Sequence, residues 1–209
     1  MEIDTHGVLN KILAPFFYPA LGNARIYWLY LLTALGLAGI AYAADPGRRS
    51  LVDFLRYCFP KAVYAHDSTL LDLKYFFVSR ISWALVLAPA VIGAPFIAEG
   101  TTALLRSVTG VASLGVSAGI GLQIAVTIVW IVVFDFALFL GHWLQHRIPT
   151  LWEFHKVHHS APVLTPLTVY RVHPVDDLLY GWLVGLATGG FAGAIGFVAA
   201  TPIEPFTIF

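Results

Sequence analysis

Four long apolar stretches constrain the fold of this chain more than any other feature of its sequence. A helix needs about 20 apolar residues to cross the hydrocarbon core of a bilayer, which is about 30 Å thick. A soluble core helix of that length would show a polar stripe, and none of the four stretches does. The sequence therefore predicts about four transmembrane helices, over residues 26–44, 78–98, 119–140 and 178–200.

The composition favours a membrane protein and argues against several soluble classes. Hydrophobic residues make up 58% of the 209 residues and charged residues 11%, against about 25% charged residues in a typical soluble domain. This balance excludes a disordered chain. Twelve basic and twelve acidic residues leave no net charge to attract nucleic acid. Cys58 is the single cysteine, which excludes disulfide scaffolds, zinc fingers and iron–sulfur clusters.

The distribution of Lys and Arg predicts the orientation in the membrane. Residues 45–77 and 141–177 are rich in these residues, whereas residues 99–118 contain only Arg106. The first two segments are therefore expected on the cytoplasmic side. The residues before Arg25 lack the features of a signal peptide, so the first span is expected to be an anchor. We expect a multi-pass protein of the bacterial plasma membrane, because the spans are rich in Ala and Gly, with the endoplasmic reticulum as the alternative.

Small residues recur every four positions in the last apolar stretch. They are Gly181, Gly185, Gly189 and Gly193. Such spacing allows two helices to approach closely, either within one chain or between two chains. We favour packing within the chain, and a homodimer remains the open alternative.

Six of the eight histidines fall between residues 142 and 173. His142 and His146 are four residues apart, so on a helix they lie on one face. Asp135 lies two turns earlier on the same face, inside an apolar span where an ionisable group is costly and usually functional. Pro149 disfavours helix in the residue before it and is expected to end this helix.

A second short helix is predicted directly after the proline. Thr150 and Glu153 have the T-x-x-E spacing of a capping box, which marks a helix start. Two short helices joined by a proline turn would bring five imidazoles to one volume. The second helix is predicted to carry His155, His158 and His159.

Five clustered histidines indicate a metal site, because imidazole is the commonest metal-binding side chain and protonated rings would repel one another. Such a site suits Fe, Cu, Zn or Ni, and more than four histidines exceed the needs of one tetrahedral zinc ion. Two metal ions are therefore indicated, and at a membrane face two irons suggest O2 activation directed at a lipid. A zinc hydrolase, with Glu153 as its acidic base, and a haem-b electron-transfer bundle are the alternatives.

The histidine motifs resemble those of the fatty acid hydroxylase/sterol desaturase superfamily. The resemblance covers roughly residues 60–180, including the segment H-D-S-x3-D-L-K-Y-F at 66–76. The motifs are D-x6-H-x3-H-R at Asp135, His142, His146 and Arg147, W-x2-H-x2-H-H-S from Trp152 to Ser160, and R-x-H-P at Arg171, His173 and Pro174.

The resemblance implies one all-α integral membrane domain over residues 1–209, with a cytosolic histidine-rich helical cap that holds two iron ions. It implies O2-dependent hydroxylation or desaturation of a lipid C–H bond, for example in a sterol or fatty acyl chain. Electrons would come from a separate donor, such as a cytochrome b5-like protein or a ferredoxin with its reductase. The implied ligands are His142, His146, His155, His158 and His159.

Three further residues are candidates for the metal site or its surroundings. Asp135 is expected to accept a hydrogen bond from a ligand histidine. His173 is a candidate sixth ligand, and Arg171 is expected to position the cap through its hydrogen bonds. The superfamily has a further H-x-x-H-H motif after the fourth span, and no histidine follows His173. We therefore expect this chain to be an N-terminal fragment of a longer protein.

Overall fold

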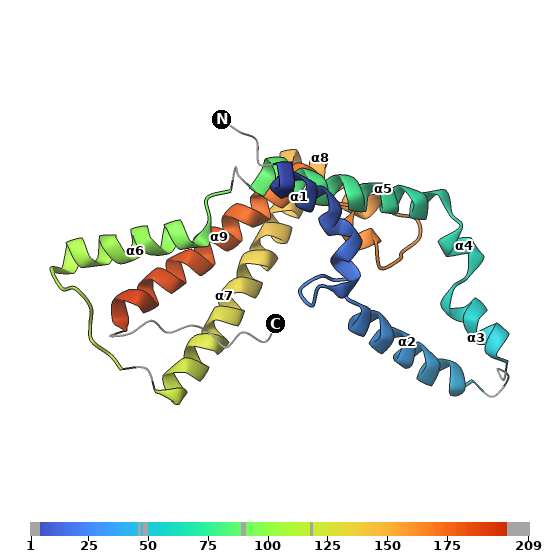
Figure 1. The fold of residues 1–209 in the computed structure, drawn as a ribbon, viewed down its shortest axis with the longest axis horizontal. Helices are drawn as coiled ribbons and strands as arrows, with labels where there is room; N and C mark the ends of the chain where they lie inside the picture. The colour runs from blue at the N-terminus through green and yellow to red at the C-terminus, as the bar shows by residue number, and fades with distance from the viewer. Residues whose placement is uncertain (1–4, 46, 48–49, 89–90, 118, 200–209) are drawn as a thin grey trace. The chain divides into compact units, whose positions relative to one another are not determined.

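A computed structural model describes residues 5–45, 47, 50–88, 91–117 and 119–199 (Figure 1). This part of the chain is helical, and its only extended pairing is an isolated bridge between Val116 and Ala199. The prediction of an all-α fold is therefore confirmed for the described residues. The contacts between residues divide the chain into two compact units. Unit 1 covers the described residues up to Leu85 together with Lys156–His173, and unit 2 covers Val86–His155 and the described residues from Pro174 onward.

Unit 2 contains the two longest helices. Helices α7 and α9 are the only two in the described residues that are long and apolar enough to cross a membrane, with mean hydropathies of 2.5 and 1.5. They correspond to the predicted third and fourth spans, although residue 200, the predicted end of the fourth, lies outside the described residues. Helix α9 packs against both α6 and α7. The helices of unit 2 are α6 (Ala94–Thr109), α7 (Ile120–Arg147), α8 (Pro149–His155) and α9 (Pro174–Val198).

The glycines of α9 bring its backbone against α6. A Cβ atom added to Gly189 would lie 2.6 Å from the carbonyl oxygen of Ala94, so a larger residue would force the helices apart. The Thr102 hydroxyl on α6 donates a hydrogen bond of 2.8 Å to the carbonyl oxygen of Gly193. The small-residue pattern thus serves packing within the chain, as predicted.

Unit 1 has a small aromatic core. Ile26, Phe76 and Tyr170 are buried together. The rings of Phe76 and Tyr170 pack edge to face, with their centroids 4.9 Å apart. Burial raises the pKa of the Tyr170 hydroxyl above its ordinary value. The helices of unit 1 are α1 (Thr5–Phe17), α2 (Trp28–Ala43), α3 (Leu51–Cys58), α4 (Lys61–Tyr64) and α5 (Asp67–Ser82), with 3-10 turns η1 (Tyr18–Ala20), η4 (His158–Ser160) and η5 (Thr168–Tyr170).

The predicted second span, residues 78–98, is not one helix, so this prediction is wrong. Helix α5 ends at Ser82, a π-helical turn follows over Trp83–Leu87, and α6 begins only at Ala94. The segment contains two prolines, which cannot donate a backbone hydrogen bond and clash with the preceding turn. One of them, Pro95, lies in the first turn of α6, where proline is tolerated. The predicted first span forms α2, which at 16 residues is short for a crossing.

Candidate metal centre

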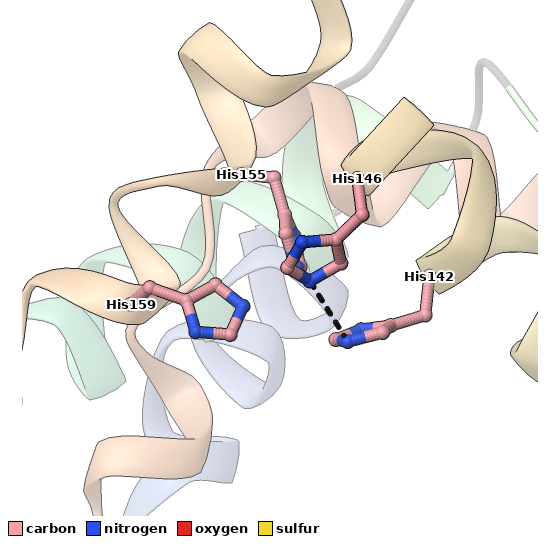
Figure 2. A group of neighbouring side chains, drawn as sticks. All are labelled: His142, His146, His155 and His159. Carbon is pink, nitrogen blue, oxygen red and sulfur yellow. Dashed lines mark hydrogen bonds between the residues drawn. The ribbon is translucent and has the colours of Figure 1, made fainter. Parts of the chain in front are cut away.

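Helix α7 positions the first two histidines. It continues without interruption from its apolar part to Arg147 and ends where Ile148 turns extended before Pro149, as predicted. His142 and His146 lie on one face of this helix, one turn apart. Their ring centroids are 4.7 Å apart, and their Nε2 atoms are 3.1 Å apart (Figure 2). Regular helix geometry therefore pairs these two rings.

Helix α8 returns the third histidine to the same place. It begins at Pro149, two residues before the first helical position that the capping box predicted, so Thr150 lies inside the helix and does not cap it. Proline is well suited to a first helical position, which explains the earlier start. His155 is the last residue of α8 and is 3% exposed. Its ring centroid lies 4.8 Å from that of His142 and 5.0 Å from that of His146.

The three histidines have the spacing of ligands around a common ion. Each offers one ring nitrogen, and these atoms lie within 4.8 Å of one another. Two imidazole nitrogens about 2.1 Å from one ion, at angles of about 90–109°, would be about 3.0–3.4 Å apart. The 3.1 Å between the Nε2 atoms of His142 and His146 falls in this range. Within unit 2, the donor set therefore fits a metal ion.

Two residues of α9 contact the Nδ1 atoms of His155 and His142. The Asp176 carboxylate is 1% exposed, and its Oδ2 lies 3.5 Å from His155 Nδ1. The Tyr180 hydroxyl lies 3.4 Å from His142 Nδ1. A partner at Nδ1 fixes the tautomer and orientation of an imidazole and directs Nε2 to a metal. Asp176 and Tyr180 are four residues apart and share one helix face.

Sequence reasoning missed this pair on α9. The available signal was an acidic residue in the first turn of an apolar helix, three positions after His173, with a tyrosine one turn later. What the sequence alone does not show is that α9 packs on α7 beside the histidines. The partners of a ligand ring are set by that tertiary contact.

The remaining histidines belong to unit 1. Helix α8 ends at His155, so the predicted helix through His159 is wrong; His158 and His159 form the 3-10 turn η4. Their ring centroids are 5.2 Å apart. His173 is the residue immediately before α9. The assignment of these three as ligands rests on the sequence motifs.

The structure gives the two charged candidates different surroundings. Asp135 is exposed on α7, and the described residues include no hydrogen bond or ion pair to its side chain. Arg171 is 2% exposed and forms an ion pair with Asp72, with 2.6 Å between Nε and Oδ1. A guanidinium has only donors and is not a metal ligand. The hydrogen bonds of Arg171 fit the positioning role and not the ligand role.

Comparison with known proteins identifies the same part of the chain. The family model described as fatty acid hydroxylase matches residues 127–206, which include most of α7 and all of α8 and α9. A stretch of 48 residues is 38% identical to the ornithine lipid hydroxylase OlsE of Rhizobium tropici; it covers 23% of this chain and 14% of that protein. The search of solved structures found no significant match. These matches agree with the motif resemblance: residues 127–206 are similar to the fatty acid hydroxylase family, and a shorter stretch is similar to a lipid hydroxylase.

Proposed function

We propose that this chain is the metal-binding part of a membrane hydroxylase or desaturase that uses two iron ions and O2 to oxidise a lipid C–H bond. The observation that carries the proposal is the convergence of three imidazoles, His142, His146 and His155, with two of them contacted at Nδ1 from α9. The family match over residues 127–206 and the similarity to a lipid hydroxylase support the substrate class.

His158 and His159 are proposed as further ligands. They follow His155 by three and four residues, so the backbone limits the distance between their Cα atoms and that of His155 to about 15 Å. Imidazole donors of this number suit iron. His173, two residues after the buried Arg171, is the candidate for an additional ligand.

The residues around the rings would prepare them for iron. Asp176 and Tyr180 hold the Nδ1 sides of His155 and His142, so both rings present Nε2 to one volume. The Trp152 ring lies 5.2 Å from that of His146 and shields one side of it. Bound iron would supply the activation of O2 and the removal of hydrogen from the lipid. The protein would supply geometry and an apolar surrounding.

An apolar hollow in unit 1 is a candidate site for a lipid chain. Its volume is about 780 Å³, and its walls come from α2, from residues 57–64 and from Thr165–Leu167. Leucine and alanine side chains of α2, including Leu31, Leu35 and Ala38, form one wall. Pockets for apolar ligands are lined in this way. The wall at Thr165–Leu167 belongs to the segment that follows the second histidine motif.

The reaction requires a membrane and an electron donor. Hydroxylation consumes O2, two electrons and two protons for each C–H bond oxidised, and releases one water molecule. The electrons are proposed to come from a separate cytochrome b5-like or ferredoxin-type protein. We propose a multi-pass protein with the histidines on the cytoplasmic side of a bacterial plasma membrane, consistent with the apolar helices α7 and α9.

The first test measures metal and product together. The 209-residue chain is expressed with iron supplied and purified in mild detergent, and its iron, zinc and haem contents are measured per mole of protein. Membrane lipids of the expressing cells, grown under isotopically labelled O2, are analysed by mass spectrometry. We expect bound iron and lipids that have gained one labelled oxygen atom; loss of two hydrogens without label would indicate desaturation.

The control is the double variant His142→Ala, His146→Ala, which should lose both the iron and the product. Zinc in place of iron would favour the hydrolase alternative, and a Soret band would favour the haem alternative. Bound iron without an oxidised lipid, even after a reductase and ferredoxin are added, would contradict the proposed reaction for this chain.

A further inference from the structure

Unit 1 contains a buried ion pair between distant parts of the chain. Asp72 on α5 is 0% exposed and Arg171 is 2% exposed, and the two residues are 99 positions apart. Removing two charges from water is costly, and their attraction offsets that cost only when the remaining donors and acceptors are also bonded. The stability of this pair therefore depends on the other hydrogen bonds that Asp72 and Arg171 form.

Both charged groups are extensively hydrogen-bonded. Arg171 Nη2 donates to the backbone carbonyl and to the hydroxyl of Ser68, each at 2.7 Å. Arg171 Nη1 donates to the Ser160 hydroxyl at 3.4 Å. The second carboxylate oxygen of Asp72 accepts a hydrogen bond of 2.7 Å from the Thr168 hydroxyl. All three guanidinium nitrogens and both carboxylate oxygens thus have partners.

These partners connect α5 to both ends of the second histidine segment. Ser160 directly follows His159, and Arg171 is two residues before His173. Between them, the Thr168 hydroxyl also accepts a hydrogen bond of 2.9 Å from the backbone N–H of Thr165. The segment from 158 to 173 contains only two 3-10 turns. Regular helical hydrogen bonding therefore does not fix its shape, and the network with α5 is available to do so.

We propose that Asp72, with Ser68 and Thr168, positions the histidine-bearing segment 158–173 through Arg171 and thereby sets the metal affinity of the site. Asp72 is then a positioning residue on a helix that carries no ligand. This inference rests on the proposed metal-binding function. The competing interpretation is that the network only stabilises unit 1, and the two differ in what happens to metal binding at equal stability.

The experiment titrates Co²⁺ into the full metal-free chain in detergent and follows the visible absorption spectrum, with thermal unfolding measured on the same samples. Asp72→Asn removes the charge that holds Arg171. Thr168→Val removes one hydroxyl with little change of shape. Phe76→Leu is the control for a loss of packing at the same place, because Phe76 is 3% exposed, lies one turn after Asp72 on α5 and packs against the Tyr170 ring. Its side chain is apolar, so the substitution leaves the hydrogen bonds of Asp72 and Arg171 in place.

We expect Asp72→Asn to raise the dissociation constant for Co²⁺ about 10-fold, the lower end of the range for groups bonded directly to metal ligands, because Asp72 acts through Arg171. It should also alter the spectrum at saturation, because the ligand geometry changes. Thr168→Val should weaken binding by a smaller factor in the same direction. Phe76→Leu should lower the unfolding temperature while the affinity and spectrum stay as in the unmodified chain.

Two outcomes overturn the inference and are distinguishable. If affinity falls in proportion to stability in all three variants, with an unchanged spectrum at saturation, the network is only structural. If the unmodified chain binds no Co²⁺, the proposed metal site fails and the inference fails with it. Should Asp72→Asn not fold, the milder Thr168→Val and the Phe76→Leu control still decide the question.

Discussion

The two histidine motifs of this protein are built in different ways. His142 and His146 lie on α7, a continuous helix of 28 residues, and their rings are paired by helix geometry. His158 and His159 lie in an irregular segment attached to α5 by buried side chains that are 96 or more residues away in sequence. The first motif depends on local backbone structure and the second on a long-range polar network. Changes in the two motifs should therefore affect stability and metal binding separately.

The largest effect is expected from breaking the network that holds the second motif. Arg171→Met leaves the buried Asp72 carboxylate without its counter-charge, which should lower the free energy of unfolding by about 3–5 kcal/mol. Denaturant unfolding in detergent, followed by circular dichroism, measures this change. The double variant Asp72→Leu, Arg171→Met removes both charges and should recover much of the lost stability. If the single variant is as stable as the unmodified chain, the network does not contribute as described.

The first motif should show the opposite behaviour. His146→Ala removes a ring that is exposed on the helix, so stability should change by no more than about 0.5 kcal/mol. Metal affinity should fall more than about 100-fold, beyond the range for residues that only contact a ligand. Iron content and Co²⁺ titration provide the measurement. Retention of normal affinity would show that His146 is not a ligand.

The packing of α9, the helix that contacts the first motif, against α6 can be tested at two neighbouring glycines. A side chain at Gly189 would meet the backbone of α6, so Gly189→Ala should cost about 1–3 kcal/mol through overpacking. Gly190 has nothing within 4 Å of the added Cβ, so Gly190→Ala should be neutral or slightly stabilising. Thermal unfolding of the two variants compares them directly. Equal effects would mean that α6 and α9 do not approach at Gly189.

The smallest expected effect is a difference in metal affinity between variants of two acidic residues near the first motif. Asp176→Asn should weaken metal binding about 10-fold, because its carboxylate lies beside His155 Nδ1 and helps to fix that ring. Asp135→Asn should leave the affinity unchanged, since Asp135 is exposed and the described residues include no bond to it. Co²⁺ titration of both variants is the measurement. The reverse order would support the role that the sequence predicted for Asp135.

Several features follow from the sequence because they depend on neighbouring residues. The apolar length of α7 and α9, the helix end before Pro149 and the shared face of His142 and His146 all follow from local rules. The limits of such rules are visible at residues 78–98, where hydropathy predicts one span but two prolines accompany a break between α5 and α6. They are visible again at Thr150, where proline at the first helical position overrides the capping box.

The sequence by itself determined that the chain is helical, apolar and rich in clustered histidines, since composition and spacing carry that information. Only the tertiary structure decided which groups contact those histidines and hold their segments. Asp176 and Tyr180 contact the rings because α9 packs on α7, and Asp72 holds Arg171 across 99 positions. The physical reason is that the sequence shows a carboxylate or hydroxyl on a helix but not its surroundings. Its role follows from its burial and from the partner that folding brings to it.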